Sequence, residues 1–120
     1  MGVKESLLAT RANLPTATVQ VDGVGAVSLR GMTAGECDRW RSWCRENSDK
    51  PNGRENYRAS LVAKCLVDEG GARMFNDLEL SDISAMPSAV VEALYDAAAD
   101  LCGFGVKQAD KLEKNSESRQ

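Results

Sequence analysis

The stretch TATVQVDGVGAVSLRGM, residues 16–32, decides the fold class of this chain. Its apolar side chains alternate with small or polar ones: Val19 and Val21 stand before the turn sequence Asp-Gly, and Val27 and Leu29 stand after it. An apolar period of two residues around a glycine-containing turn is typical of a β-hairpin, and the threonine and valine content favours extended strands. The sequence therefore predicts a hairpin near the N-terminus.

A short helix is predicted before the hairpin, over residues 4–12. It must end ahead of Pro15, because the residue before a proline avoids helical geometry. Leu7, Leu8 and Leu14 are its expected apolar contacts.

A second helix is predicted directly after the hairpin. The sequence TAGE, residues 33–36, is a capping box, in which the threonine hydroxyl and the glutamate carboxylate each accept from the other residue's backbone amide. The helix that follows places Cys37, Trp40 and Cys44 on one face. Trp43 lies off that stripe, so it either widens the buried face or is exposed.

Three more helices are expected, over residues 54–66, 76–84 and 87–103, and a polar loop is expected over 47–53. The first and last of these helices have an apolar stripe at helical spacing, and the middle one begins with a capping-box sequence. The predicted fold is therefore a small, mostly helical α+β domain, with an N-terminal β-hairpin followed by three to four short helices. A single globular domain is expected over residues 1–104. The polar segment 105–120 is expected to be a disordered tail.

Composition limits the function. The chain has 120 residues and a net charge of −3, which opposes a broad nucleic-acid surface. It has no histidine, the usual general base and metal ligand. Its four cysteines, far apart in sequence, are expected to be reduced thiols in the core, with a zinc site as the lesser alternative. No cofactor, no metal and no catalytic residue are expected.

No apolar run approaches the ~20 residues that a membrane-spanning helix needs. Gly2 and Ser6 fit the loose pattern for N-myristoylation, but no polybasic segment reinforces it. We therefore expect no membrane partner.

The sequence CLVDEGGARMF, residues 65–75, combines acids and glycines as metal loops and catalytic sites do. Its acids are adjacent, however, so their side chains would not converge on a calcium ion, and no nucleophile or base is spaced to help them. A structural turn is predicted instead. In it the glycines supply positive φ, the arginine stays in solvent, and the last two residues turn back into the core; its key residues are Asp68, Gly70, Gly71 and Phe75.

Three segments, taken in order, resemble the tail assembly chaperones of long-tailed, lambda-like bacteriophages with non-contractile tails. They are LRGMTAGECDRW at 29–40, LVDEGGARMFND at 66–77 and ISAMPSAVVEALYDAAADLCGF at 83–104. The family's hairpin often carries a tryptophan beside its turn glycines, where this chain has Val24.

The resemblance implies a protein of the host bacterial cytoplasm that keeps the tape-measure protein soluble, helps to recruit tail-tube subunits and is absent from the mature virion. In this family the first reading frame often shifts back near its end. Glu113, Lys114 and Asn115 can be encoded by a −1 slippery heptamer, which would give a minor, extended form that engages the tail tube. Self-association stays open.

The expected partner contacts are apolar residues outside the predicted stripes, namely Trp43, Phe104 and Val106. One alternative is a small helix-turn-helix-type DNA-binding regulator, which would use the arginines at 39, 41 and 45. The other is an enzyme subunit, for which the adjacent acids at 68 and 69 are the sole candidates.

Overall fold

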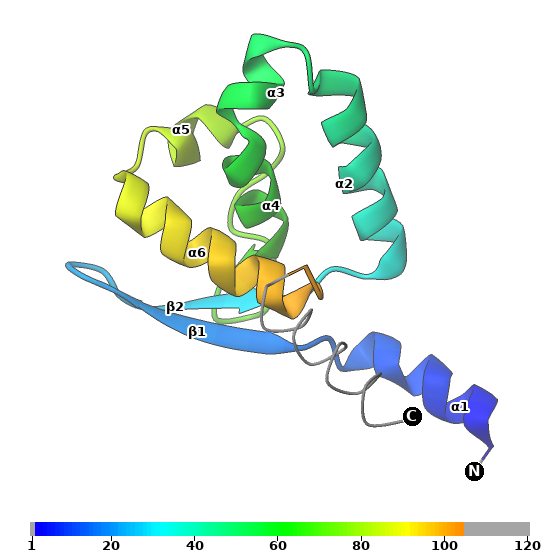
Figure 1. The fold of residues 1–120 in the computed structure, drawn as a ribbon. Coiled ribbons are helices and arrows are strands. Elements are labelled where there is room, and N and C mark those ends of the chain that lie inside the picture. Colours follow the sequence, from blue (N-terminus) through cyan, green and yellow to red (C-terminus); the bar gives the residue numbers. More distant parts are fainter. Residues whose placement is uncertain (1, 105–120) are drawn as a thin grey trace, which may run out of the picture.

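The computed structural model describes residues 2–104, and its sheet begins with the predicted hairpin (Figure 1). Strands β1 (Thr16–Val21) and β2 (Gly25–Arg30) are antiparallel, with Val19 opposite Val27. The turn between them uses positive φ at two glycines, Gly23 and Gly25. The hairpin prediction is therefore confirmed, with its alternating valines on the buried side.

A third strand was missed by the sequence analysis. The two residues of β3 (Leu66–Val67) pair antiparallel with β2, which gives the sheet order β1-β2-β3. The sequence pattern assigned these residues to the end of a helix, because their apolar side chains continue its stripe. A strand this short has no alternation of its own to reveal it.

Helix α2 (Ala34–Asn47) begins with the predicted capping box: the Glu36 amide donates to the Thr33 hydroxyl, and the Thr33 amide donates to the Glu36 carboxylate. The same carboxylate accepts two hydrogen bonds from the Arg30 guanidinium, each 3.1 Å long. This ion pair joins the end of β2 to the start of α2. The Arg30 hydrogen bonds are the main cause that lowers the pKa of Glu36 to about 2.

Two of the predicted boundaries after α2 are wrong. The expected loop at 47–53 contains the start of a short helix, α3 (Pro51–Glu55), because Pro51 is preorganised for the first helical position. The expected helix at 54–66 is broken at Asn56, and α4 covers Tyr57–Cys65. Gly53 is needed at this corner, since a Cβ there would lie 2.0 Å from the Asn47 carbonyl oxygen.

The helix expected from Asn76 begins later, as α5 (Leu80–Ser84). Half of a capping box forms at its predicted start: the Asn76 amide donates to the Glu79 carboxylate, but the Asn76 side chain accepts from Leu78. The next helix, α6 (Ser88–Leu101), starts directly after Pro87, and Gly103 stops it with a φ of 83°. Both ends of α6 lie within two residues of their predicted positions.

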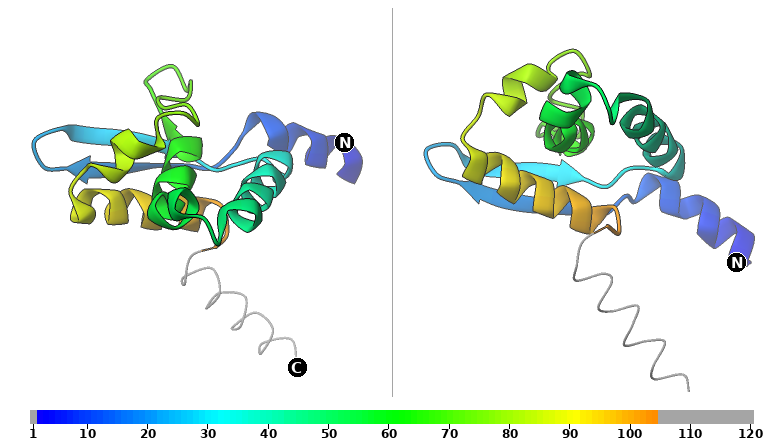
Figure 2. Two further views of the ribbon diagram at one scale, coloured as in Figure 1. Left: turned by 90° about the horizontal axis from the view of Figure 1, so that it is seen from above. Right: turned by 45° about the horizontal axis from the view of Figure 1, so that its top comes forward.

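The core lies between the sheet and the helices. Helices α4 and α6 cover one face of the sheet, and α2 stands further out (Figures 1 and 2). The largest side chains that are fully buried come from β2, α4 and α5: Leu29, Leu61, Val62, Cys65 and Ile83. The opposite sheet face carries exposed residues such as Thr18 and Gln20.

The N-terminal helix forms as expected but does not pack as expected. Helix α1 (Val3–Ala9) continues into the 3₁₀ turn η1 (Thr10–Ala12), and none of its residues is buried. Leu7 and Leu8 were predicted as its apolar contacts, yet both are exposed. The reason is its position: α1 extends beyond the sheet, away from the other helices (Figures 1 and 2).

Candidate functional site

An aromatic cluster connects α2 to the rest of the molecule. Trp40 is 6% exposed, and its indole N–H donates a 2.9 Å hydrogen bond to the Ser60 hydroxyl on α4. The ring centroids of Tyr57 and Phe104 lie 5.8 Å and 5.6 Å from that of Trp40. Such pairs add to the stabilisation from area burial alone. The cluster therefore holds α2 against α4 and against the chain that leaves α6.

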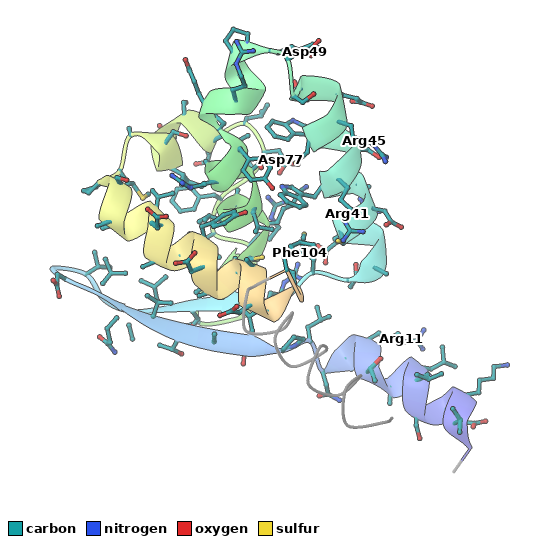
Figure 3. The ribbon with its side chains drawn as sticks, viewed as in Figure 1. Arg11, Arg41, Arg45, Asp49, Asp77 and Phe104 are labelled. Carbon is teal, nitrogen blue, oxygen red and sulfur yellow. The ribbon has the colours of Figure 1, made fainter. Side chains whose placement is uncertain are left out.

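Phe104, a predicted partner contact, belongs to this cluster. Its ring is stacked on Trp40 with an interplanar angle of 20°, and the Arg41 guanidinium carbon lies 5.1 Å above the ring centroid (Figure 3). A cation placed over an aromatic ring is attracted by the ring quadrupole. Phe104 is half-buried, so a contact with a partner would use the part of the ring that these two side chains leave exposed.

Trp43, the second predicted contact, packs partly against the core and so widens the buried face of α2. With Trp40, Arg39 and Lys64 it lines a 250 Å³ hollow between α2 and α4. The third predicted contact, Val106, lies outside the described residues. The structure thus places Trp43 and Phe104 beside the same tryptophan, one on α2 and one just beyond α6.

The residues of the predicted turn do form one. One Asp68 carboxylate oxygen accepts from the amides of Gly70 and Ala72 at 2.9 and 3.1 Å, and the Gly71 amide donates to the Asp68 carbonyl. Of the two glycines, Gly71 has positive φ, at 85°. The Asp68 carboxylate is occupied in shaping the backbone, which gives it a structural role here.

Two details of that turn differ from expectation. Arg73, expected in solvent, donates two hydrogen bonds to the Ala63 carbonyl at 3.1 and 3.0 Å and one to Asp77 at 2.9 Å. Met74, expected in the core, is 47% exposed, whereas Phe75 packs against the core. Ala63 lies in the last turn of α4, where carbonyl groups lack a partner within the helix and need a donor from elsewhere. Arg73 supplies that donor.

Asp77 completes this network, because it also accepts from Lys64 at 3.2 Å. Partial burial works against the charged form of Asp77, but the hydrogen bonds from Arg73 and Lys64 outweigh it and lower the pKa of this carboxyl group. These residues staple the end of α4 to the chain before α5. They form a structural ion-pair cluster.

Two of the four cysteines meet, a contact that their spacing of 37 residues could not reveal. The sulfur atoms of Cys65 and Cys102 lie 3.9 Å apart. The contact between the two thiols is the main cause that lowers the pKa of Cys102 and raises the pKa of Cys65. Within residues 2–104, no group of three or more cysteine or acidic side chains is arranged to hold a metal ion.

The three arginines of the DNA-binding alternative do not form one patch. Arg39 lines the hollow beside Lys64, Arg41 lies over Phe104, and Arg45 lines a different hollow beside Arg54. Arg41 and Arg45 are four residues apart on one side of α2 and Arg39 lies on another, so the three arginines form no continuous row of cations for a phosphate backbone.

Every helix in the described part of the chain is too short or too polar to cross a bilayer.

No model of a known protein family matches the sequence. No curated protein matches it significantly. The structure is similar to a solved one, that of the bacteriophage HK97 tail assembly chaperone, with a TM-score of 0.57 and 24% sequence identity. The similarity covers 82% of this chain and 95% of that chain. At this identity it shows a shared fold, in agreement with the fold that the sequence resemblance implies.

Proposed function

We propose that this protein is a phage tail assembly chaperone, which binds the tape-measure protein in the host cytoplasm, helps to recruit tail-tube subunits and leaves before the virion is complete. The observation that carries the proposal is the fold shared with the HK97 tail assembly chaperone over nearly the whole of that protein. The three sequence segments that resemble this family, in the family's order, support it independently.

The physical character of the molecule suits such a role. A protein that binds in stoichiometric amounts needs aromatic and apolar contact area rather than reactive groups. Trp43, Phe104 and Tyr57 supply such area at the surface of a chain whose net charge is −3. Repulsion between like-charged copies would help to keep the protein soluble while it holds an adhesive client.

The test is co-expression of the full chain with the long, helix-rich protein expected from the downstream gene. We expect the long protein to move from the insoluble to the soluble fraction and to elute together with the tagged chain. A long protein that stays insoluble and never co-elutes would contradict the proposal. Retention of the chain on DNA at physiological salt would favour the regulator instead.

The extended form is a separate part of the proposal. If the codons of Glu113, Lys114 and Asn115 form the slippery heptamer and an open −1 frame follows, mass spectrometry of the proteins expressed from the gene should detect a minor, longer product. Synonymous codons that destroy the heptamer should abolish this product and leave the main chain unchanged. Persistence of the longer product after that change would contradict frameshifting at this position.

A further inference from the structure

Two neighbouring hollows on the helical surface have no role in the preceding sections. One has a volume of 470 Å³ and lies between α4 and the start of α6; the other has a volume of 490 Å³ and lies between the end of α2 and α3. Both are lined by Arg54 and Tyr57. We name the combined feature the Tyr57 groove, and its other lining residues used below are Cys44, Arg45, Glu55, Arg58, Met86 and Val91.

The centre of the groove is an aromatic ring held in place. Tyr57 is 43% exposed, yet its ring lies 5.8 Å from that of Trp40 and 6.1 Å from that of Tyr95. The ring therefore loses little further freedom when a ligand covers it. Exposed tyrosines that are already rigid are frequent anchors of protein interfaces, because their apolar body and polar tip can both make contacts.

The side chains around this ring include apolar and cationic groups and one acid, Glu55. Met86, Val91 and Cys44 supply the apolar lining. Arg45, Arg54 and Arg58 supply three guanidinium groups, against an overall net charge of −3. The local charge is therefore opposite to that of the molecule as a whole.

These guanidinium groups are weakly engaged within residues 2–104. Arg54 donates to the Asp49 carbonyl, and Arg45 donates to the Ser42 hydroxyl, each at 3.2 Å. Arg58 has a carboxylate neighbour in Glu92, but at 3.8 Å and with both side chains more than half exposed. Pairs as exposed as this contribute little to stability, so a partner carboxylate can replace Glu92 at low cost.

We propose that the Tyr57 groove binds an acidic peptide segment of the client protein, with an aromatic or aliphatic anchor over Tyr57 and carboxylates on Arg54 and Arg58. The proposal rests on the proposed function and assigns it a binding surface. Each hollow has the size of a pocket for one or two side chains, and arginine pairs carboxylates in a bidentate geometry. Glu55 and Glu92 divide the positive charge at this edge, which suits a few separate carboxylates better than the continuous row of phosphates on a nucleic acid.

The experiment uses the full chain and synthetic peptides that tile the downstream long protein, with binding followed by fluorescence polarisation. We expect the peptides that bind to be acidic with an apolar anchor, and their affinity to fall as salt rises. The double variant Arg54→Glu, Arg58→Glu should lower the affinity for these peptides about tenfold or more, since truncating or reversing close charge pairs has effects of this order.

The matched control reverses a charge elsewhere: Arg11→Glu, in the exposed turn after α1, should change peptide affinity by less than about twofold because rim charges distant from a contact matter little. Arg54 and Arg58 are exposed, so the double variant should keep its circular dichroism spectrum. Tyr57→Ala provides a second test of the anchor, and Tyr57→Phe, which keeps the ring, should retain most of the affinity.

Three results would overturn the groove assignment. In the first, the double variant binds the peptides as well as the unmodified chain does. In the second, the peptides that bind contain no acidic residues. In the third, duplex DNA at equal concentration displaces the peptide. If no peptide binds while the intact long protein still co-purifies, the groove is wrong and the chaperone role stands. If the intact long protein does not co-purify either, the chaperone role itself fails.

Discussion

Helices α1 and α4 are similar in sequence pattern and opposite in environment. Both carry apolar side chains at helical spacing, such as Val3 and Leu7 in α1 and Leu61 and Cys65 in α4. Six of the nine residues of α4 are buried, whereas none of the seven in α1 is, and Leu7 is 65% exposed. Both helices were expected from the sequence, although α4 begins later than the expected helix at 54–66, and the expected burial of apolar side chains is found in α4 but not in α1.

The difference teaches where burial comes from. Helix α4 lies among α2, α5, α6 and the sheet (Figure 1), and its Ser60 hydroxyl and Cys65 thiol both contact side chains of neighbouring segments. Helix α1 extends past the end of the sheet (Figure 1), and within residues 2–104 none of its residues is buried against another element. Most of the stability of a helix this short comes from packing, so α1 should contribute almost nothing to the stability of the domain.

The largest effect expected from the packed side of this comparison is at Trp40. Trp40→Ala should lower the free energy of unfolding by about 3–5 kcal/mol, because it removes a large buried ring and leaves the Ser60 hydroxyl without its donor. Urea denaturation followed by circular dichroism measures the change. A midpoint that scarcely moves would show that α2 is not attached through this ring.

The most direct test of the comparison substitutes one leucine in each helix. Leu61→Ala should cost about 3 kcal/mol, since the side chain is fully buried in α4 and its loss leaves a cavity. Leu7→Ala should change the free energy of unfolding by less than about 0.5 kcal/mol, as surface substitutions usually do. A substantial loss of stability in Leu7→Ala would show that α1 is covered in solution.

The sequence was a good guide wherever the determining interaction is local. The hairpin follows from alternation around its glycines, the start of α2 from a capping box four residues long, and the end of α6 from Gly103. These features need no knowledge of the rest of the molecule.

The features that the sequence did not predict depend on contacts between distant parts of the chain. The two-residue strand β3 exists because β2 pairs with it, and the contact between Cys65 and Cys102 exists because α4 and α6 lie side by side. The Tyr57 groove likewise combines residues of α2, α3, α4 and α6, so no single stretch of sequence predicts it. Of the predicted partner contacts, Phe104 stacks on Trp40 and Trp43 lines a hollow together with Trp40, an arrangement that the fold alone creates for Phe104.

The ion pair between Arg30 and Glu36 gives the packed half a pH dependence that α1 lacks. The folded-state pKa of Glu36 is about 2, below its ordinary value of 4.5, so the stabilisation is complete above pH 4.5 and is lost as pH falls towards 2. Glu36→Gln should therefore cost about 2 kcal/mol at neutral pH and progressively less in acid.

Denaturation midpoints measured between neutral pH and pH 2 test this, with Glu5→Gln on α1 as the control. The control should follow the unmodified chain at every pH, because within residues 2–104 Glu5 has no ion pair. A constant gap between Glu36→Gln and the unmodified chain, down to the lowest pH, would contradict the assignment of the effect to this carboxylate.

The last comparison concerns Gly70 and Gly71, the two glycines in the turn that follows α4 and β3. Gly71 has a φ of 85° and Gly70 does not have positive φ, so Gly71→Ala should cost about 1–2 kcal/mol, the penalty for a left-handed residue with a Cβ. Nothing lies within 4 Å of the added Cβ, so this cost is conformational rather than steric. Gly70→Ala should cost less, because its Cβ would make ordinary contact, at 3.4 Å, with the Asp68 carboxylate oxygen. Urea denaturation of the two variants decides the order, and equal losses would mean that the turn is held by the Asp68 hydrogen bonds and not by the conformation of Gly71.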